Sequence, residues 1–299
     1  MVSTTLKPKS IKNAACTLGE NPLWNRKLQR LFWADIAGGR IFSYSPDFND
    51  IRTEIEIKNQ IGAFAFSAGG ALVLCTEGEV LEVPFSCGRF DPSHIKKVFA
   101  VPYIAGERFN DAICGPRGRL ISGSKRKNNT EGVLYSFCKG SSPVKLKEHL
   151  GISNGMAFTD GGRRFYHVDS AVKEITAYDY DVQSGAISNG KIFFRMPPDS
   201  GEPDGMTADS EGHLWVACWN GGAVLRLSPG GEVEEKIDVP AKQVSSVCFG
   251  GRDFSTLFIT TASMGGDEKG FGKNGEYIGG EIFYAATEYK GICEYEADI

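Results

Sequence analysis

Short hydrophobic runs, rich in β-branched and aromatic residues, recur along the chain at intervals of about 45 residues. There are six such runs, and they begin at Leu31, Leu72, Leu120, Phe165, Leu214 and Leu257. Another apolar run precedes each of them and a further one follows, with Gly, Asp, Ser and Asn in between. Runs of this kind, separated by turn residues, predict β-hairpins. Long amphipathic helical patterns are absent from the sequence.

Six modules of this size, each with three clear strands and room for a fourth, match the repeat of a β-propeller. A small sheet cannot bury both of its faces alone, whereas packing six sheets around an axis buries them. We therefore predict an all-β protein in which residues 1–299 form one six-bladed β-propeller domain, with four-stranded blades around a central channel. The first twenty residues are expected to supply the outer strand that closes the last blade. A β-sandwich is the alternative, but it gives no reason for a six-fold repeat.

The composition excludes several classes of partner. A formal net charge of −4 gives no electrostatic reason to expect nucleic acid or an anionic membrane as a partner. No apolar stretch approaches the length of a membrane helix, and the first twenty residues lack the apolar core of a signal peptide. The eight cysteines form no CxxC pair. We therefore expect a cytoplasmic protein with reduced cysteines, and no pattern in the sequence assigns an oligomeric state.

Four polar residues occupy equivalent places in four modules, 10 or 11 residues before the central hydrophobic run. They are Glu20, Asn110, Asn154 and Asp204. Because the innermost strands of a propeller line its channel and all begin on one face, these side chains should converge at one mouth. The same counting gives Ile61 or Gly62 and Ser246 in the other two modules, which would add an apolar wall and a hydroxyl.

The chemistry of these side chains favours a metal site. Carboxylate and amide oxygens are hard ligands that suit Ca²⁺, Mg²⁺ or Mn²⁺, whereas zinc normally recruits His or Cys. The four histidines show no ligand spacing. Asn154-Gly155 and Asp204-Gly205 are ordinary turn dipeptides when each is taken alone. Their equivalent placement in different modules is what favours a functional site.

At these residues the chain resembles the family of senescence marker protein (regucalcin), gluconolactonase and luciferin-regenerating enzyme. The matching segments are LGENPLW (18–24), ERFNDAICGPRGRL (107–120), GISNGMAF (151–158), YDYDVQSGAISN (178–189), EPDGMTADSEGHLWVACWNGG (202–222), SSVCFGGRDFSTLFITTA (245–262) and GGEIF (279–283). They occur in order over nearly the whole chain. The resemblance and the repeat agree on a six-bladed propeller with one divalent cation.

The resemblance also implies roles for single residues. It implies that Glu20, Asn154 and Asp204 ligate the metal directly, and that Arg108 and Asn110 bind the substrate. Ca²⁺ is the leading candidate for the cation, with Mg²⁺, Mn²⁺, Zn²⁺ and Fe²⁺ as alternatives. The family chemistry implies hydrolysis of a small-molecule sugar lactone to the aldonic acid. Two other functions stay open: a metal-dependent esterase or phosphotriesterase on the same propeller, and a non-enzymatic calcium-binding protein.

The segment SGSKRKNNTEG (122–132) departs from the animal members of the family, in which an acidic residue of this segment contacts the substrate. Here the segment is basic and rich in amides. Asn128, or alternatively Asn129, is therefore a candidate to bind a sugar hydroxyl. The basic run 125–127 is expected to be a solvated loop. The departure leaves the predicted metal site intact and bears on the identity of the substrate.

Lactone hydrolysis needs an electrophile, a water molecule and a base. Asp204 is the candidate base that takes a proton from the attacking water, and Glu20 is the second candidate. A role for Asp204 as a metal ligand alone stays open. We expect neither a GxSxG nucleophile elbow nor a plausible Cys–His pair, and therefore no covalent nucleophile.

Overall fold

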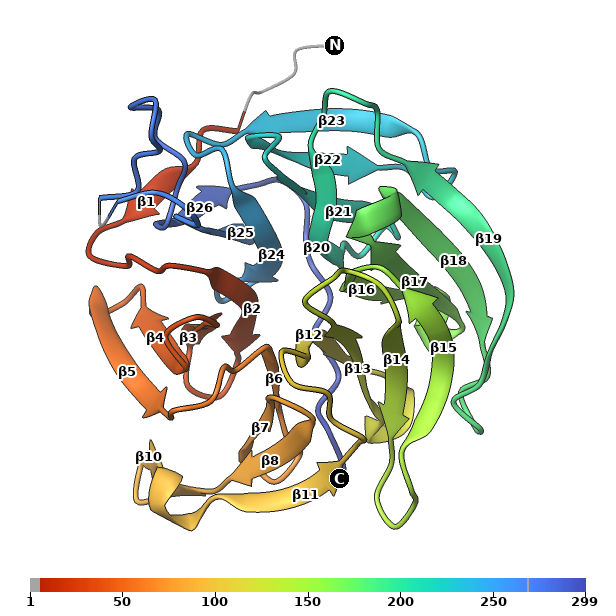
Figure 1. Ribbon diagram of the computed structural model, residues 1–299. Helices are drawn as coiled ribbons and strands as arrows, with labels where there is room; N and C mark the ends of the chain where they lie inside the picture. The colour runs from red at the N-terminus through yellow and green to blue at the C-terminus, as the bar shows by residue number, and fades with distance from the viewer. Residues whose placement is uncertain (1–5, 268) are drawn as a thin grey trace.

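The computed structural model describes residues 6–267 and 269–299 and shows six four-stranded antiparallel sheets around a central axis (Figure 1). The prediction of an all-β, six-bladed propeller is confirmed. In five blades the four strands follow one another along the chain, and the first strand lies innermost. The six innermost strands are the apolar runs that precede each central hydrophobic run in the sequence.

The strands of blades 1 to 3 are β2 (Gly19–Asn25), β3 (Arg30–Asp35), β4 (Arg40–Ser45) and β5 (Asp50–Glu56); β6 (Ala63–Phe66), β7 (Leu72–Cys75), β8 (Glu79–Val83) and β11 (Lys96–Ala100); and β12 (Arg108–Cys114), β13 (Leu120–Lys125), β14 (Gly132–Phe137) and β15 (Val144–Leu150). Those of blades 4 to 6 are β16 (Ser153–Thr159), β17 (Arg164–Asp169), β18 (Glu174–Tyr180) and β19 (Ile187–Arg195); β20 (Glu202–Ala208), β21 (Leu214–Trp219), β22 (Ala223–Leu227) and β23 (Val233–Asp238); and β24 (Val244–Gly250), β25 (Thr256–Thr261), β26 (Ile282–Ala286) and β1 (Lys9–Ile11). A small hairpin of β9 (Phe85–Ser86) and β10 (Arg89–Phe90) lies outside the blades, and four 3-10 turns are η1 (Pro92–His94), η2 (Pro116–Gly118), η3 (Asp160–Gly162) and η4 (Ser170–Val172).

Burial explains why the central runs are continuously hydrophobic instead of alternating. Every residue of β3 is buried, because neighbouring blades cover both faces of the sheet at this depth. The outermost strand β19, in contrast, is mostly exposed. In the part of the chain that the structure describes, no helix is long and apolar enough to cross a membrane.

The ring is closed by a strand from the N-terminal region, as expected from the sequence. Strand β1 pairs antiparallel with β26, so the last blade combines both ends of the chain (Figure 1). Ile11 of β1 is only 3% exposed and belongs to the same buried cluster as Trp33 of blade 1 and Phe258 of blade 6. The closing strand is therefore held by side-chain packing as well as by backbone pairing.

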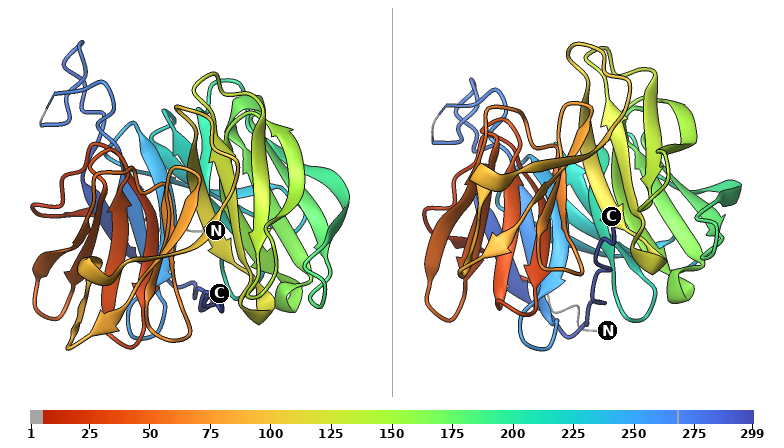
Figure 2. Two further views of the ribbon diagram at one scale, coloured as in Figure 1. Left: turned by 60° about the horizontal axis from the view of Figure 1, so that its bottom comes forward. Right: turned by 90° about the horizontal axis from the view of Figure 1, so that it is seen from below.

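The C-terminal segment forms a second tie, across the bottom of the ring. Figure 2 shows it passing beneath the blades. Ala297 exchanges backbone hydrogen bonds with Phe66 and Ala68 of blade 2, and Asp298 donates to the carbonyl of Gly118 in blade 3. Ser210 of blade 5 donates to the carbonyl of Lys290. The segment thus links blades from opposite sides of the channel.

If β1 closes the ring by packing, Ile11→Ala should lower the free energy of unfolding by about 2–4 kcal/mol, because it leaves a cavity beside Trp33. Urea denaturation of the full chain measures this. Lys9→Ala, at an exposed position of the same strand, is the matched control. A loss below about 0.5 kcal/mol for Ile11→Ala would contradict the packing account.

Candidate metal and substrate site

The inner strands deviate from regular pairing where the predicted site residues lie. The register shifts between Glu20 and Leu23 in β2, between Phe109 and Asp111 in β12, between Ser153 and Met156 in β16, and between Pro203 and Met206 in β20. Bulges of this kind leave residues unpaired and re-aim their side chains. They therefore free Asn110, Asn154 and Asp204 from the ladder and turn them toward the axis.

Glycine lets these irregular strands approach one another. A Cβ atom at Gly155 would lie 2.4 Å from the carbonyl oxygen of Asp204, and one at Gly205 would lie 2.0 Å from Ser246 Oγ. The glycines of Asn154-Gly155 and Asp204-Gly205 are thus required for the close packing of β16, β20 and β24. A turn alone does not account for them.

The mouth of the channel holds a cavity of about 500 Å³. Its lining includes five of the six predicted site residues: Glu20, Arg108, Asn110, Asn154 and Asp204. Among the other lining residues are Leu18, Ile36, Lys125, Asn129, Ile152, Ser170, Ala171, Lys173, Glu202, Trp219 and Met264. The structure therefore brings together residues that are almost two hundred positions apart in the sequence.

Two oxygens in this cavity have no protein partner. Asn154 donates from Nδ2 to Ser170 Oγ at 3.0 Å, and Ser170 donates in turn to the carbonyl of Pro203 at 2.6 Å. These two hydrogen bonds fix the side-chain amide of Asn154. Asn154 Oδ1 and Asp204 Oδ1 are nevertheless buried without a hydrogen bond from any described residue. An unpaired buried oxygen costs free energy, which a cation would recover. The donor set therefore fits an oxygen-ligated divalent cation.

Three buried carboxyl groups of the central channel, those of Glu20 and Asp204 at the mouth and of Asp111 below it, form no ion pair with a described residue. Burial, then the Asp204 and Asp111 carboxylates, raise the pKa of Glu20 well above its usual range. Burial, and then Asp111, likewise raise the pKa of Asp204. Within the described residues, no Lys, Arg or His forms an ion pair with any of these three carboxyl groups. A divalent cation would relieve their repulsion and their poor solvation.

Arg108 and Asn110, unlike Asn154 and Asp204, form hydrogen bonds with each other. Arg108 Nη1 donates to Asn110 Oδ1 at 2.6 Å and to the carbonyl of Phe109 at 2.9 Å. Asn110 Nδ2 donates to the carbonyl of Ser153 at 2.8 Å. Because the oxygen of Asn110 already has a donor, it suits a metal less well than that of Asn154. The pair is placed beside the carboxylates, where it could orient a ligand.

Some expected positions do not reach the mouth cavity. Asn128 is exposed, is not among the residues lining the cavity, and accepts from the backbone of Thr130 at 3.3 Å; Asn129 lines the cavity instead. Ser246 faces the lower part of the channel, and the hydroxyl at the mouth is that of Ser170. Ile61 is buried in the core between blades 1 and 2.

The expectation that the basic run 125–127 is a solvated loop is wrong for its first two residues. Lys125 is the last residue of β13 and lines the mouth cavity. The Nε atom of Arg126 lies 3.4 Å from Glu107, a buried carboxylate. Lys127 alone is exposed, as expected. The run straddles the end of a strand, which its charge pattern did not reveal.

The segment GISNG (151–155) does have GxSxG spacing, and Ser153 Oγ lies 2.7 Å from His167 Nε2. Both side chains are buried, at 0% and 1% exposure, and Ser153 is packed under Gly123 and does not line the cavity. Burial lowers the pKa of His167 to about 3. Ser153 begins strand β16 and His167 lies within β17, so the helix of a nucleophile elbow is missing and the pair is a buried structural contact.

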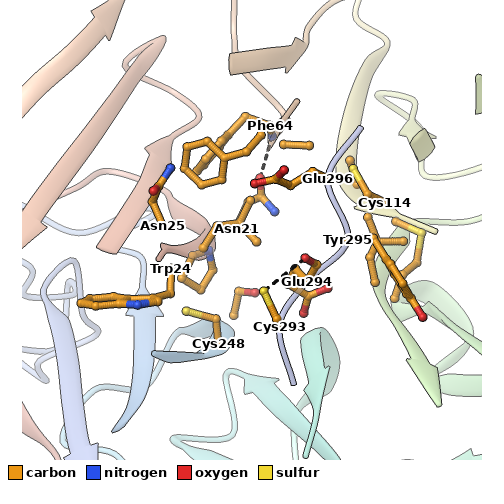
Figure 3. A pocket seen from close by; sticks show the side chains of 18 of the residues that line it. Asn21, Trp24, Asn25, Phe64, Cys114, Cys248, Cys293, Glu294, Tyr295 and Glu296 are labelled. Atoms are coloured by element: carbon orange, nitrogen blue, oxygen red, sulfur yellow. Dashed lines mark hydrogen bonds between the residues drawn. The ribbon is translucent and has the colours of Figure 1, made fainter. Parts of the chain in front are cut away.

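A second cavity, of about 720 Å³, occupies the lower channel and is larger than the mouth cavity (Figure 3). Its wall is largely apolar and aromatic, and the C-terminal residues Cys293–Glu296 form one side of it. Asn21 points into it and accepts a hydrogen bond from the backbone of Phe64 at 2.6 Å. None of the predicted ligands lines this cavity. Its size therefore does not make it the stronger candidate.

A further acidic cluster lies at Asp209, Glu211 and His213 in blade 5. Its carboxylates already have partners. Asp209 accepts from Trp215 Nε1 at 3.0 Å and from Arg226 Nε at 3.1 Å, and Arg226 also forms an ion pair with Glu211 at 2.9 Å. The buried guanidinium of Arg226 already neutralises these carboxylates, so the mouth is the better metal site.

The molecule is thus a six-bladed propeller with an acidic, amide-containing mouth. The chain belongs to the SMP-30/Gluconolactonase/LRE-like region family, whose model matches residues 18–263. It is 32% identical over 292 residues to pentonolactonase XacC of Haloferax volcanii, covering 97% of each chain. It is also 32% identical over 297 residues to regucalcin of Danio rerio, covering 98% of each. The resemblance inferred from the sequence motifs is confirmed.

Solved structures agree on the fold. A luciferin-regenerating enzyme superposes with a TM-score of 0.90 at 25% identity, over 98% of this chain and 100% of that one. Regucalcin from Agrobacterium tumefaciens, described as a calcium-binding protein, gives a TM-score of 0.88 at 22% identity, over 98% of each chain.

The buried carboxyl of Asp111 generates a prediction about pH. Burial, and then the charge of Glu294, raise the pKa of Asp111 to about 7, whereas an unfolded Asp titrates near about 3.9. The folded protein holds this proton more tightly, so the group's contribution to stability is present below about pH 4 and is lost as the pH rises to about 7. As the pH rises over this interval in EDTA, the free energy of unfolding of wild type should fall by about 2–4 kcal/mol relative to that of Asp111→Asn.

Denaturant unfolding of both proteins at several pH values measures this difference. Asp199→Asn, at an exposed carboxyl, is the control and should show no such trend. A difference between wild type and Asp111→Asn that does not change with pH would contradict the account.

Proposed function

We propose that the protein hydrolyses a sugar lactone to the corresponding aldonic acid with the help of one divalent cation bound at the propeller mouth. The observation that carries this proposal is the pair of buried, unpartnered oxygens of Asn154 and Asp204 in the same cavity as Glu20. Similarity over nearly the whole chain to a protein named pentonolactonase supports the lactone as substrate. The six blades act as one domain in this proposal, because the site draws on blades 1, 3, 4 and 5.

Glu20, Asn154 and Asp204 would hold the cation. All three offer oxygen, which favours Ca²⁺, with Mg²⁺ and Mn²⁺ next. Zn²⁺ and Fe²⁺ are further alternatives, although no His or Cys lines the mouth cavity. The bound cation would polarise the lactone carbonyl and stabilise the negative charge that develops on its oxygen.

The remaining steps belong to the side chains. Asp204 accepts a proton from the water that attacks the carbonyl carbon. The ring C–O bond then breaks, and the ring oxygen takes up the proton to become a hydroxyl. Arg108 and Asn110 orient the lactone, and Asn129 lies at the rim in place of Asn128. Glu20 is the alternative base.

The test is proton release from a panel of aldono-1,4- and aldono-1,5-lactones, with EDTA and with each added metal. We expect metal-dependent turnover that Asp204→Asn lowers by at least about 10²-fold, because it removes both a ligand and a base. The same panel should include a carboxylic ester and a phosphotriester. Turnover of these alone would favour the esterase alternative, and metal binding without any turnover would favour the calcium-binding protein. Wild-type lactonase activity in Asp204→Asn would contradict the proposed role of this residue.

Ser170 offers a separate test of the metal ligands. It accepts from Asn154 Nδ2 and so turns Asn154 Oδ1 toward the cavity. Ser170→Ala should weaken Ca²⁺ binding by about 10–100-fold, the usual effect of losing a group that orients a ligand. Titration calorimetry measures the affinity, and Ser141→Ala in an exposed loop is the control. Equal Ca²⁺ affinities of Ser170→Ala and Ser141→Ala would contradict a role for Ser170 in orienting Asn154 as a metal ligand.

A further inference from the structure

Lys125 and Arg108 form a pair of cations on one wall of the mouth. They are direct partners in the antiparallel register of β12 and β13, so their side chains lie on the same face of the blade. Both line the mouth cavity beside Asp204. Lys125 is partly buried and stands at the end of its strand, next to Ile152 of blade 4.

The two cations repel each other, although the carboxylates of Glu20 and Asp204 attract Arg108 and that of Asp204 attracts Lys125. Like charges directly opposite each other on a sheet destabilise it. Burial lowers the pKa of Arg108 to about 10, and burial together with Arg108 lowers the pKa of Lys125. Neither side chain forms an ion pair with any residue that the structure describes. The neighbouring Arg126, in contrast, pairs with Glu107.

With a divalent cation bound, the charges around the cavity do not balance. Glu202 lies 3.8 Å from Lys173 and is neutralised by it. Glu20 and Asp204 would balance a divalent cation. Arg108 and Lys125 then remain without a counter-charge inside the cavity. In addition, only Nη1 of Arg108 donates to an acceptor in the described part of the chain, which leaves its other N–H groups free for a ligand.

We propose that the lactone carries an anionic group of its own, a carboxylate or a phosphate, and that Lys125, beside Arg108, binds that group. The inference rests on the proposed function and narrows it to the class of acidic sugar lactones. A neutral lactone offers hydroxyls to this wall but no charge to balance it. Charge-assisted hydrogen bonds to such a group are the stronger kind, and Arg can bind it with two parallel donors.

The kinetic test compares three lactones of similar size: glucono-1,5-lactone, which is neutral, glucaro-1,4-lactone, which carries a carboxylate, and 6-phosphoglucono-1,5-lactone, which carries a phosphate. We expect wild type to favour one acidic lactone over the neutral one by about tenfold or more in kcat/KM. Which one it favours identifies the anionic group. Lys125→Gln should lower kcat/KM for that lactone about tenfold more than for the neutral one. Lys127→Gln removes the same charge from the exposed part of the segment and should leave this ratio unchanged.

A binding measurement keeps this inference separate from the proposed activity. Calorimetry with the Ca²⁺-loaded protein compares gluconate, glucarate and 6-phosphogluconate, which cannot be hydrolysed as lactones. We expect glucarate or 6-phosphogluconate, each of which has a second anionic group, to bind more tightly than gluconate. Lys125→Gln should abolish this difference in affinity, and Lys127→Gln should preserve it.

If no lactone of any charge is hydrolysed but glucarate or 6-phosphogluconate binds more tightly than gluconate through Lys125, the proposed function fails while the anion site stands. A wild type that favours the neutral lactone would overturn the inference, and so would equal binding of gluconate, glucarate and 6-phosphogluconate. So would a Lys125→Gln variant that weakens neutral and acidic ligands alike.

Discussion

Burying carboxylate oxygens without an ion-pair partner is costly, and the central channel of this propeller does so at three residues, two at the mouth and one below it. Glu20, Asp111 and Asp204 are each 5–6% exposed, and none has an ion-pair partner among the described residues. Asn154 adds a buried amide oxygen without a donor. Replacing these groups by apolar residues would be more favourable for folding alone. Their presence is best explained by a cation that stabilises them together.

The fold supplies what such a site needs. Bulges in β2, β12, β16 and β20 turn side chains toward the axis, and the close approach of the inner strands at Gly155 and Gly205 brings them together. Two ties keep the ring closed, one through the pairing of β1 with β26 and the other through the C-terminal segment. The geometry of the mouth thus depends on contacts far from it, because the site residues come from four different blades.

The repeat in the sequence was sufficient to predict the blades, the closing strand and the convergence of Glu20, Asn110, Asn154 and Asp204. These follow from a period, and a period can be read from hydrophobicity. Ser170 could not be found in this way, because it lies in the turn η4 and has no equivalent in other modules.

Lys125 and Ser246 show the other limit of the sequence. Whether a residue at the end of a strand faces the mouth depends on the exact register, which bulges shift by one position. Counting residues placed Ser246 at the mouth, but the bulge between Val244 and Ser246 leaves it facing the lower channel. The same uncertainty hid Lys125 within an apparent loop. Only the three-dimensional structure shows which residues at the strand ends face the mouth cavity.

The most direct test of the metal site is anomalous diffraction from crystals of the full chain grown with Mn²⁺. The account predicts one strong anomalous peak at the channel mouth, within coordination distance of Glu20, Asn154 Oδ1 and Asp204. No peak at the mouth, or a peak at Asp209, Glu211 and His213 in its place, would contradict it.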